Sequence, residues 1–207
     1  GRGLPEGAEQ EMIDAGVPDW YIGSCKKIKY LFPKAHAVAY VMMAFRIAWF
    51  KVYYPLAFYA AYFYRRSQKG GFDAVLMTRG MEAIQANMEA IENNENATDK
   101  DEDLLTTMEV VYEYYLRGFE FLPIDIYKSH ATKFLIQDGK LLPPFVSISG
   151  LGENAAWDLM NGREGKTFIS IEEVALACPK VSKTHIQMLK DAGAFGSLPD
   201  TSQISLF

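Results

Sequence analysis

The first 120 residues of the chain show the spacing of apolar and polar residues that is typical of α-helices. Residues 35–50 form an alanine-rich, unbroken run, and Pro33 stands just before it, where proline favours the start of a helix. Pro55 starts a second helix in the same way, and the glycine pair at 70–71 ends it. An acidic, asparagine-rich patch at 92–103 is expected to be a solvated loop or helix end. The pattern predicts four helices, over residues 35–50, 55–64, 73–93 and 104–116.

The pattern changes near residue 120. Two short apolar runs, at 124–127 and 132–136, predict strands, and Asp138-Gly139 predicts a turn after the second run. Small helices with tight loops are expected after the proline pair at 143–144. We therefore expect a mainly α fold with a small β element, and a soft domain boundary between about 118 and 124.

The bulk composition is that of a globular protein from a reducing compartment. The chain has 207 residues, of which 49% are hydrophobic, so one or two domains with a real core are expected. Cys25 and Cys178 lie far apart in sequence, and they give neither a disulfide framework nor a set of zinc ligands. His130 and His185 have no partners at metal-ligand spacing, so we expect no metal site in this chain.

The sequence predicts neither secretion nor a membrane span. The N-terminus is polar, which argues against a signal peptide. Arg46, Lys51 and Pro55 interrupt the most apolar region, 35–64, so that no charge-free run reaches the roughly 18 residues of a membrane span. We therefore expect a cytoplasmic protein that does not bind a membrane. Because position 1 is not Met, we also expect a piece of a longer protein.

Charge is distributed unevenly along this acidic chain, whose net charge is -5. No acidic residue lies between Asp19 and Asp73, and Tyr and Phe are interleaved with the basic residues of that span. This pattern favours a phosphate-bearing partner, and an interface with an acidic protein segment is the alternative. The basic residues concerned are Lys26, Lys27, Lys29, Lys34, Arg46, Lys51, Arg65, Arg66 and Lys69.

A candidate phosphate-binding turn lies at residues 148–156, Ile-Ser-Gly-Leu-Gly-Glu-Asn-Ala-Ala, which resembles a helix-hairpin-helix motif. Gly150 and Gly152 flank Leu151, so the backbone can turn tightly and approach a ligand closely. The N–H groups that open the following helix, near Asn154, then face that ligand, and a phosphate fits such a site. A plain turn is the alternative, because a lone Gly-x-Gly is a weak signal.

A second hairpin is expected at residues 179–185, Pro-Lys-Val-Ser-Lys-Thr-His. It departs from the motif because it lacks the paired glycines. Lys180 and Lys183 would therefore have to supply the contacts that a glycine loop provides in the first hairpin. Two hairpins in tandem hold DNA without reading its bases, because phosphate contacts carry position and not sequence.

The end of the chain carries two apolar anchors behind a turn-rich, polar stretch. Exposed Leu and Phe side chains are costly, since burying each is worth about 1.5–3 kcal/mol. The five-residue segment resembles the peptide with which bacterial replication proteins bind the hydrophobic cleft of the sliding clamp. The alternative is that its apolar side chains fold back onto the chain's own core. The segment consists of Gln203, Ile204, Ser205, Leu206 and Phe207.

The segment 25–40, Cys-Lys-Lys-Ile-Lys-Tyr-Leu-Phe-Pro-Lys-Ala-His-Ala-Val-Ala-Tyr, resembles the fingers region of the family C bacterial replicative DNA polymerases. These share a Lys-x-His-x-x-x-Tyr pattern that opens a helix, carried here by Lys34, His36 and Tyr40. The Phe-Pro-Lys-Ala-His-Ala run is most similar to the PolC-type DNA polymerase III alpha subunit. The hairpins and the terminal peptide follow in that family's order, so the resemblance covers essentially the whole chain.

The resemblance implies a C-terminal fragment of a much longer polymerase, made of three parts. Residues 1–120 would be the C-terminal part of the fingers domain, 121–198 a helix-hairpin-helix domain that binds duplex and primer-template DNA, and 199–207 the tail that binds the sliding clamp. Lys34 and His36 would contact the triphosphate of the incoming nucleotide, and Tyr40 would border the base pocket. Arg46 is a weaker nucleotide-binding candidate.

The resemblance also implies where the chemistry lies. Family C polymerases hold two magnesium ions with aspartates of the palm domain, and no paired-Asp motif on a plausible strand occurs here. We therefore expect magnesium in the full-length enzyme but not in this fragment, which should bind DNA without polymerising it. The tyrosines and phenylalanine of 53–62 are expected in the core: Tyr53, Tyr54, Phe58, Tyr59 and Tyr62.

Two other classes of protein remain as alternatives to a polymerase fragment. One is a non-enzymatic DNA-binding adaptor that the clamp recruits. The other is a structural helical interaction domain whose basic stretch meets an acidic protein, and it predicts no salt-dependent DNA binding. The upstream sequence distinguishes the polymerase from the adaptor, because an Asp-x-Asp palm motif there would favour the polymerase.

Overall fold

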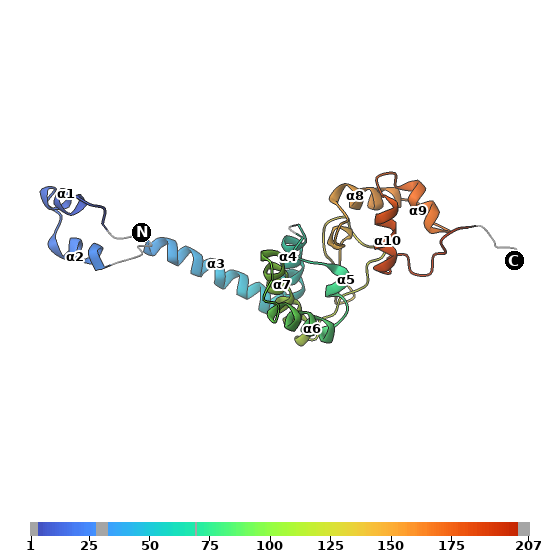
Figure 1. Ribbon diagram of the computed structural model, residues 1–207, viewed down its shortest axis with the longest axis horizontal. Helices are drawn as coiled ribbons and strands as arrows, with labels where there is room; N and C mark the ends of the chain where they lie inside the picture. The colour runs from blue at the N-terminus through green and yellow to red at the C-terminus, as the bar shows by residue number, and fades with distance from the viewer. Residues whose placement is uncertain (1–3, 28–32, 69, 203–207) are drawn as a thin grey trace. The chain divides into compact units, whose positions relative to one another are not determined.

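The computed structural model describes residues 4–27, 33–68 and 70–202 (Figure 1). The chain divides into two compact units, residues 1–49 and 50–207. The fold is mainly helical with one two-stranded sheet, which confirms the predicted fold class.

The first unit contains two short helices and most of a long one. α1 spans Ala8–Asp14, α2 spans Asp19–Lys27 and α3 spans Lys34–Tyr53. An ion pair between Lys26 and Glu9 joins α2 to α1. α3 begins directly after Pro33, as the sequence predicts.

α3 carries apolar residues on every side, and they are exposed along its length. Phe45, for example, is 74% exposed, and Tyr53 and Tyr54, which were expected in the core, are exposed as well. By length and composition alone, α3 is the one helix in the described ranges that could cross a bilayer, although Arg46 and Lys51 interrupt it as the sequence shows. A helix that packs inside a soluble protein passes the same test, so the finding by itself assigns no membrane.

Aromatic side chains fill the centre of the second unit. α4 (Pro55–Ser67) and α7 (Asp99–Leu116) bury Tyr59, Phe63 and Tyr114 completely. The ring centroids of Tyr59 and Tyr114 lie 5.0 Å apart, and Phe121 lies 4.6 Å from Tyr114. Aromatic pairs of this kind contribute about 0.5–1.5 kcal/mol each beyond the area that they bury. The cluster therefore fixes α4, α7 and the segment after α7 as one body.

Two helix predictions need correction. The helix predicted over 73–93 is in fact two, α5 (Ala74–Met77) and α6 (Met81–Glu92), because Gly80 between them has a φ of 100° that favours glycine. α7 begins at Asp99 rather than at residue 104. Thr98 and Asp101 form a capping box there, and acidic residues suit the positive end of a helix. The second part of the acidic patch is thus the first turn of α7.

The small sheet forms around the predicted turn but not from the predicted strands. β1 (Leu135–Gln137) and β2 (Lys140–Leu142) pair antiparallel, with Gln137 opposite Lys140. Asp138 and Gly139 both have positive φ, 52° and 74°, as a tight hairpin turn requires. The strand predicted at 132–136 therefore begins at residue 135.

Residues 124–127 do not form the other predicted strand, and a turn occupies residues 126–128 instead. The Asp125 carboxylate accepts hydrogen bonds from the N–H groups of Tyr127 and Lys128, at 2.7 and 3.1 Å. An aspartate that bonds the backbone just after it competes with strand pairing. The alternation of apolar residues predicts a strand, but it does not reveal the hydrogen bonds of the Asp125 carboxylate.

Three short helices and a 3₁₀ turn complete the second unit. η1 spans Phe145–Ser147, α8 spans Glu153–Gly162, α9 spans Ile171–Ala177 and α10 spans Lys183–Asp191. The buried Ala155 and Ala156 allow α8 to pack closely, as expected. Their core is continuous with the aromatic cluster of α4 and α7. The predicted domain boundary between 120 and 121 therefore falls within a continuous core. The different functions assigned to residues 1–120 and 121–198 stay predictions.

Candidate nucleic-acid interface

The first hairpin is built around one glycine at which a side chain is unfavourable and one that faces open space. Gly150 has a φ of 89°, and a β-carbon there would lie 2.7 Å from Met188 Cε of α10. Leu151, only 2% exposed, turns its side chain into the core, and its N–H donates to the Ile148 carbonyl at 3.0 Å. A β-carbon at Gly152 would have no atom within 4 Å. Gly150 therefore shapes the turn, while Gly152 leaves its outer side clear.

The start of α8 presents backbone N–H groups that no side chain caps. Gly152 occupies the N-cap position, and no capping hydrogen bond is made there within the described part of the chain. By contrast, Ser170 caps α9 and Ser182 caps α10 with their hydroxyl groups. The first four N–H groups of a helix need an external acceptor, and the helix dipole favours an anion. α8 is thus ready to receive a phosphate oxygen.

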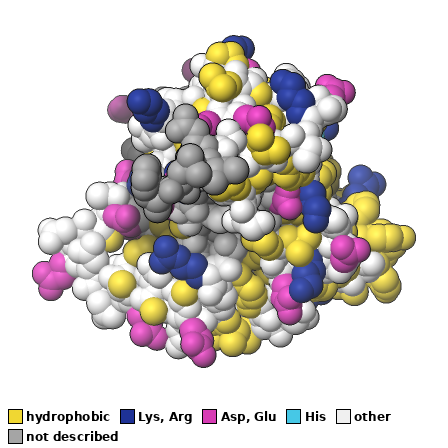
Figure 2. Space-filling model, turned by 90° about the vertical axis from the view of Figure 1, so that its right-hand side faces the viewer, with side chains coloured by type: hydrophobic (Ala, Val, Ile, Leu, Met, Phe, Trp, Pro, Cys, Tyr) yellow, Lys and Arg dark blue, Asp and Glu magenta, His cyan; other side chains and the backbone are white. Residues whose placement is uncertain are grey.

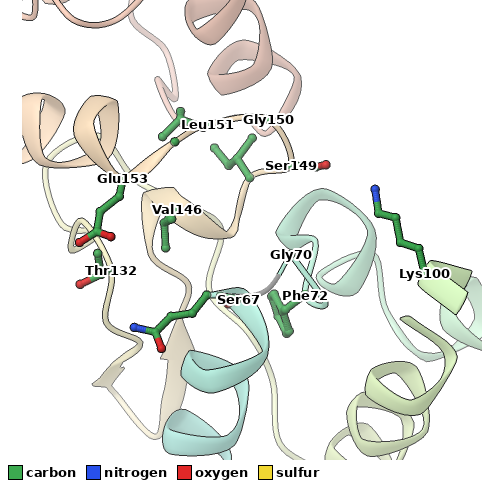
Figure 3. Close-up of a pocket in the computed structure, with 13 residues that line it drawn as sticks. Ser67, Gly70, Phe72, Lys100, Thr132, Val146, Ser149, Gly150, Leu151 and Glu153 are labelled. Atoms are coloured by element: carbon green, nitrogen blue, oxygen red, sulfur yellow. The ribbon is translucent and has the colours of Figure 1, made fainter. Parts of the chain in front are cut away.

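The hairpin forms one wall of a cleft of about 740 Å³ in the second unit (Figure 3). Ser67, Gly70 and Phe72, from the end of α4 and the segment after it, lie across from it, and Lys100 of α7 stands at the same opening. Glu153, whose Oε1 accepts from Trp157 Nε1 at 3.2 Å, also lines the cleft. The cleft is therefore of mixed charge, and the uncapped start of α8 lies in its wall.

The second hairpin is held from outside by α8. The Lys180 N–H donates to the Asp158 carboxylate at 2.7 Å. A β-carbon at Gly162, one turn beyond Asp158, would lie 2.5 Å from Cys178 Sγ and 2.9 Å from the Ala177 carbonyl oxygen. The second hairpin has no glycine of its own, and Gly162 of α8 is the glycine that lets the Ala177–Cys178 backbone pack closely against α8.

Several backbone donors of this second hairpin, including the Lys180 N–H, are already engaged. The Val181 N–H donates to the Cys178 carbonyl at 2.9 Å. Ser182 Oγ accepts from the His185 N–H, and His185 Nδ1 accepts from the Ser182 N–H, both at 3.2 Å. What this hairpin offers a phosphate is therefore the charge of exposed side chains, those of the predicted Lys180 and Lys183.

Cys178 is a packing residue in this loop. It is 1% exposed, and burial raises the pKa of its thiol to about 11, with the Asp158 carboxylate adding to the shift. The thiol therefore stays protonated at neutral pH and behaves as a small apolar group. This agrees with the expectation from its isolated position in the sequence.

The nucleotide-binding candidates all lie on the first unit's long helix. Lys34 and His36 occupy the first turn of α3, and the His36 and Tyr40 rings lie 4.5 Å apart, one turn along the same face. Arg46 follows ten residues after His36, which places it roughly 15 Å further along the axis and on another face. The structure brings His36 and Tyr40 together, leaves Lys34 in the same first turn as His36, and separates Arg46 from them.

Part of the basic stretch is matched by acidic side chains of the chain itself. Lys51 Nζ lies 2.6 Å from Glu113 Oε2, and Arg66 Nη2 lies 2.8 Å from Asp103 Oδ1. With the Lys26 pair, three of the nine basic residues have carboxylate partners within the described residues. Sequence reasoning missed these pairs, because the acidic partners of Lys51 and Arg66 lie 62 and 37 residues away.

The remaining predicted residues either lie at the hairpins or outside the described part of the chain. Gly150, Gly152 and Asn154 are exposed at or just before the start of α8, and their contact with DNA stays a prediction. The predicted clamp-binding residues 203–207 lie outside the described residues, and so do residues 28–32 and 69 of the basic stretch. Figure 2 shows Lys and Arg side chains interspersed with acidic and hydrophobic ones on the face that it draws.

Two short helices joined at a glycine turn, followed by a similar pair, define a helix-hairpin-helix module, a class of fold that suggests DNA binding. The family model of the helix-hairpin-helix motif matches residues 118–203. Proteins named DNA polymerase III PolC-type match the chain over its full length. The relative from Thermotoga petrophila is 49% identical, that from Caldanaerobacter subterraneus 51% and that from Bacillus cereus 47%.

The chain belongs to the family of PolC-type DNA polymerase III. It spans 14–15% of the length of these curated relatives while all of the chain is covered. This coverage fits the fragment of a longer polymerase that the sequence analysis expects. What the whole polymerase binds and catalyses comes to this chain only as a proposal.

Proposed function

We propose that the chain is the C-terminal part of a replicative DNA polymerase that grips duplex DNA with its hairpins, contacts the incoming nucleotide through α3 and is tethered to the sliding clamp by residues 203–207. The observation that carries the proposal is the open start of α8. Exposed glycines and uncapped N–H groups there lie next to a cleft and support a phosphate site at this position.

Duplex binding would combine two kinds of phosphate contact. Backbone N–H groups at Gly152–Asn154 donate to phosphate oxygens directly, and Lys180 and Lys183 add charge from the second hairpin. Neither kind of contact reads a base, so binding should be independent of sequence. It should weaken steeply with salt, because phosphate contacts release counterions.

A pair of substitutions at Gly152 tests the duplex site. Asp and Ser are both good N-cap residues, so each should preserve α8, and a β-carbon fits there. Gly152→Asp places a negative charge where the phosphate should bind, and we expect a tenfold or greater loss of affinity for a random-sequence duplex by fluorescence anisotropy. Gly152→Ser is the matched control and should lose less. If Gly152→Asp bound the duplex as well as the wild type, the start of α8 would not be the phosphate site.

The α3 candidates would act on the incoming nucleotide. Lys34 and His36 lie in the first turn of α3, where the helix dipole adds to their attraction for a triphosphate. In the full-length polymerase, Lys34→Met and His36→Gln should each lower kcat/KM for the nucleotide about tenfold, since a hydrogen bond to a charged group is worth about 1.5–3 kcal/mol. Affinity for primed DNA should not change.

Arg46→Met is the matched control for these two variants. It removes a positive charge from the same helix, but at a position that the structure separates from Lys34 and His36. We expect a smaller effect on nucleotide use. Unchanged nucleotide kinetics in both first-turn variants would return these residues to a structural role.

The chain should not polymerise by itself. Within the described residues, no group of three or more His, Cys, Asp or Glu side chains could hold a metal ion. The residues present therefore do not fit the magnesium site of a polymerase, and we propose that the palm carboxylates belong to another part of the enzyme. Nucleotide incorporation by the pure chain on primed DNA with magnesium, lost on mutation of one of its own acidic residues, would contradict this.

The last five residues would bind the clamp as an extended peptide. Leu206 and Phe207 would fill an apolar cleft of the clamp, and Gln203 would hydrogen-bond at its rim. Two anchors at roughly 1.5–3 kcal/mol each, less the cost of ordering the peptide, predict micromolar affinity. Calorimetric titration of a peptide of the last ten residues against a clamp tests this. No heat at high micromolar peptide would contradict it.

A further inference from the structure

A second, smaller cleft lies between α9 and α10, away from the glycine hairpin. Its volume is about 360 Å³, which is within the range of small-ligand sites, about 300–1,000 Å³. The apolar side chains of Ile171, Ala175 and Ile186 form its floor. Lys183, Lys190, Glu172 and Asp200 line it as well. The cleft therefore combines apolar side chains with charged groups of both signs.

The chain that leads to the tail is fixed at this cleft. The N–H groups of Ile171 and Glu172 donate to the carbonyls of Pro199 and Asp200, at 2.9 and 3.2 Å. The Asp200 carboxylate lies 2.6 Å from Lys190 Nζ, and Asp200 itself lines the cleft. Sequence analysis treated residues 199–202 as part of a free tail, yet residues 199 and 200 are bound to the module.

We infer that the cleft between α9 and α10 is an internal docking site for the chain's own residues 204–207. The apolar side chains of Ile204, Leu206 and Phe207 would occupy it when no clamp holds the tail. This docking accounts for two features together. The cleft is lined in part by apolar side chains, and further apolar side chains follow a few residues after Asp200, which lies at the cleft.

Residues 204–207 follow Asp200 closely enough in sequence to reach the cleft. Residue 204 follows Asp200 by four residues and residue 207 by seven, which correspond to roughly 13–25 Å of extended chain. Asp200 lies at the rim, so the tail reaches the cleft without any rearrangement of the module. A short tether of this kind gives an effective concentration on the order of millimolar. At that effective concentration, even weak apolar contacts would hold the tail in the cleft much of the time.

The chemistry of the tail also fits the cleft. In an extended segment, residues 204 and 206 point to the same side, so Ile204 and Leu206 can enter together. The Lys183 ammonium group lines the cleft and can donate to carbonyl groups of the tail, whereas Lys190 already pairs with Asp200 and the Gln187 amide donates to Asp191. A second copy of the chain would offer the same side chains, but only at its own concentration in solution.

Docking would couple the two activities proposed above. A docked tail covers Lys183, which is a predicted DNA contact, and withholds Leu206 and Phe207 from the clamp. Apparent affinity for the clamp then falls in proportion to the fraction of chains with a released tail. DNA that engages Lys183 should release the tail, and this would favour the clamp at sites where duplex is bound.

The test uses the 207-residue chain without clamp or DNA, so its failure is distinct from failure of the proposed function. In a sample with labelled methyl groups and a labelled Phe207 ring, we expect nuclear Overhauser contacts between that ring and the methyls of Ile186 and Ala175. Leu206→Ser with Phe207→Ser, and truncation after Ser202, should give the same amide shifts at Ala175, Ile186 and Gln187. The shifts should not change on dilution.

A matched pair of substitutions completes the test. Ala175→Phe fills the cleft and should abolish the contacts of Phe207, whereas Leu176→Phe, on the neighbouring, 84% exposed position, should retain them. Contacts from Phe207 to methyls elsewhere, equal contacts in both variants, or amides of the cleft that do not move on truncation would each overturn the inference. Contacts that vanish on dilution would point to a second copy and would overturn it too.

Discussion

The two hairpins of the second unit have similar outlines but offer a ligand different things. The first makes its turn with its own glycine, Gly150, and leaves the start of α8 uncapped. The second makes its turn with Cys178 and Val181, and a Ser182–His185 capping box closes the start of α10. One hairpin therefore presents free backbone donors, and the other presents side-chain charge.

The difference shows that the hairpins depend on each other. Asp158 and Gly162, one turn apart on α8, support the second hairpin through the Lys180 N–H and the Cys178 loop. Met188 of α10 in turn packs over Gly150 of the first. Each hairpin thus packs against the helix that follows the other one. A substitution in one hairpin should therefore destabilise both.

The largest expected effect comes from Gly162→Ala. Its β-carbon would meet Cys178 Sγ and the Ala177 carbonyl oxygen, and a backbone atom cannot move aside as a flexible side chain can. We expect a loss of about 1–3 kcal/mol, the usual range for overpacking. Urea unfolding measures it. Cys178→Ala should recover part of the loss, and a fully stable Gly162→Ala would show that α8 does not support the second hairpin closely.

Gly150→Ala should come next. The positive φ costs an alanine about 1–2 kcal/mol, while the Met188 methyl group can shift. Gly152→Ser, two residues on, should be close to neutral in the same unfolding experiment, because its φ of -71° suits any residue. Equal losses at the two glycines would contradict the division of roles between them.

A smaller effect concerns His130, which supports the first hairpin from outside. Its Nδ1 accepts from the N–H groups of Thr132 and Lys133 at 3.0 and 3.2 Å, and its ring lies 5.4 Å from that of Trp157 on α8. Burial lowers the pKa of His130, with Lys133 and Arg163 adding to the effect. Protonation would destroy both hydrogen bonds.

The sign of the pH dependence follows from that lowered pKa. The unfolded chain takes up the proton first, so the stability due to neutral His130 is complete above the ordinary value of 6.5 and is lost as pH falls towards the lowered value. His130→Asn can still accept from the backbone but does not titrate. Thermal unfolding should show the acid-side loss in the wild type and less of it in this variant. Parallel curves would contradict the role of His130.

The smallest effects are expected at the second hairpin. Lys180→Ala and Lys183→Ala should each reduce the slope of log affinity against log salt by about one and weaken binding equally on all duplex sequences. Stability should not change, because both side chains are exposed. A sequence-dependent loss would mean that this hairpin reads bases.

The sequence predicted what is local and missed what is tertiary. The start of α3 follows from Pro33, and the first hairpin follows from Gly150 and Gly152, because these residues act through their own backbone. The support of Lys180 by Asp158 spans 22 residues and leaves no periodic signal. The same holds for Asp200 and Lys190, whose ion pair fixes the chain before the tail.

The errors have the same origin. Residues 124–127 alternate like a strand, but a single Asp125 carboxylate turns the backbone. Tyr53 and Tyr54 are apolar enough for a core, yet the end of α3 leaves them exposed while Tyr59, less than two turns into α4, is fully buried. Composition gives the tendency of a residue to be buried, and only the packing of the helices decides which face is covered.

The central claim is that the backbone at the start of α8 is the main phosphate site. Titration of the ¹⁵N-labelled chain with a short duplex, followed by amide NMR at moderate salt, tests it most directly. The account predicts that the N–H groups of Gly152, Glu153 and Asn154 shift first and furthest. Those of Lys180, Ser182 and His185, already bonded within the fold, should shift less. Amides at the second hairpin that move while Gly152–Asn154 stay fixed would contradict the account.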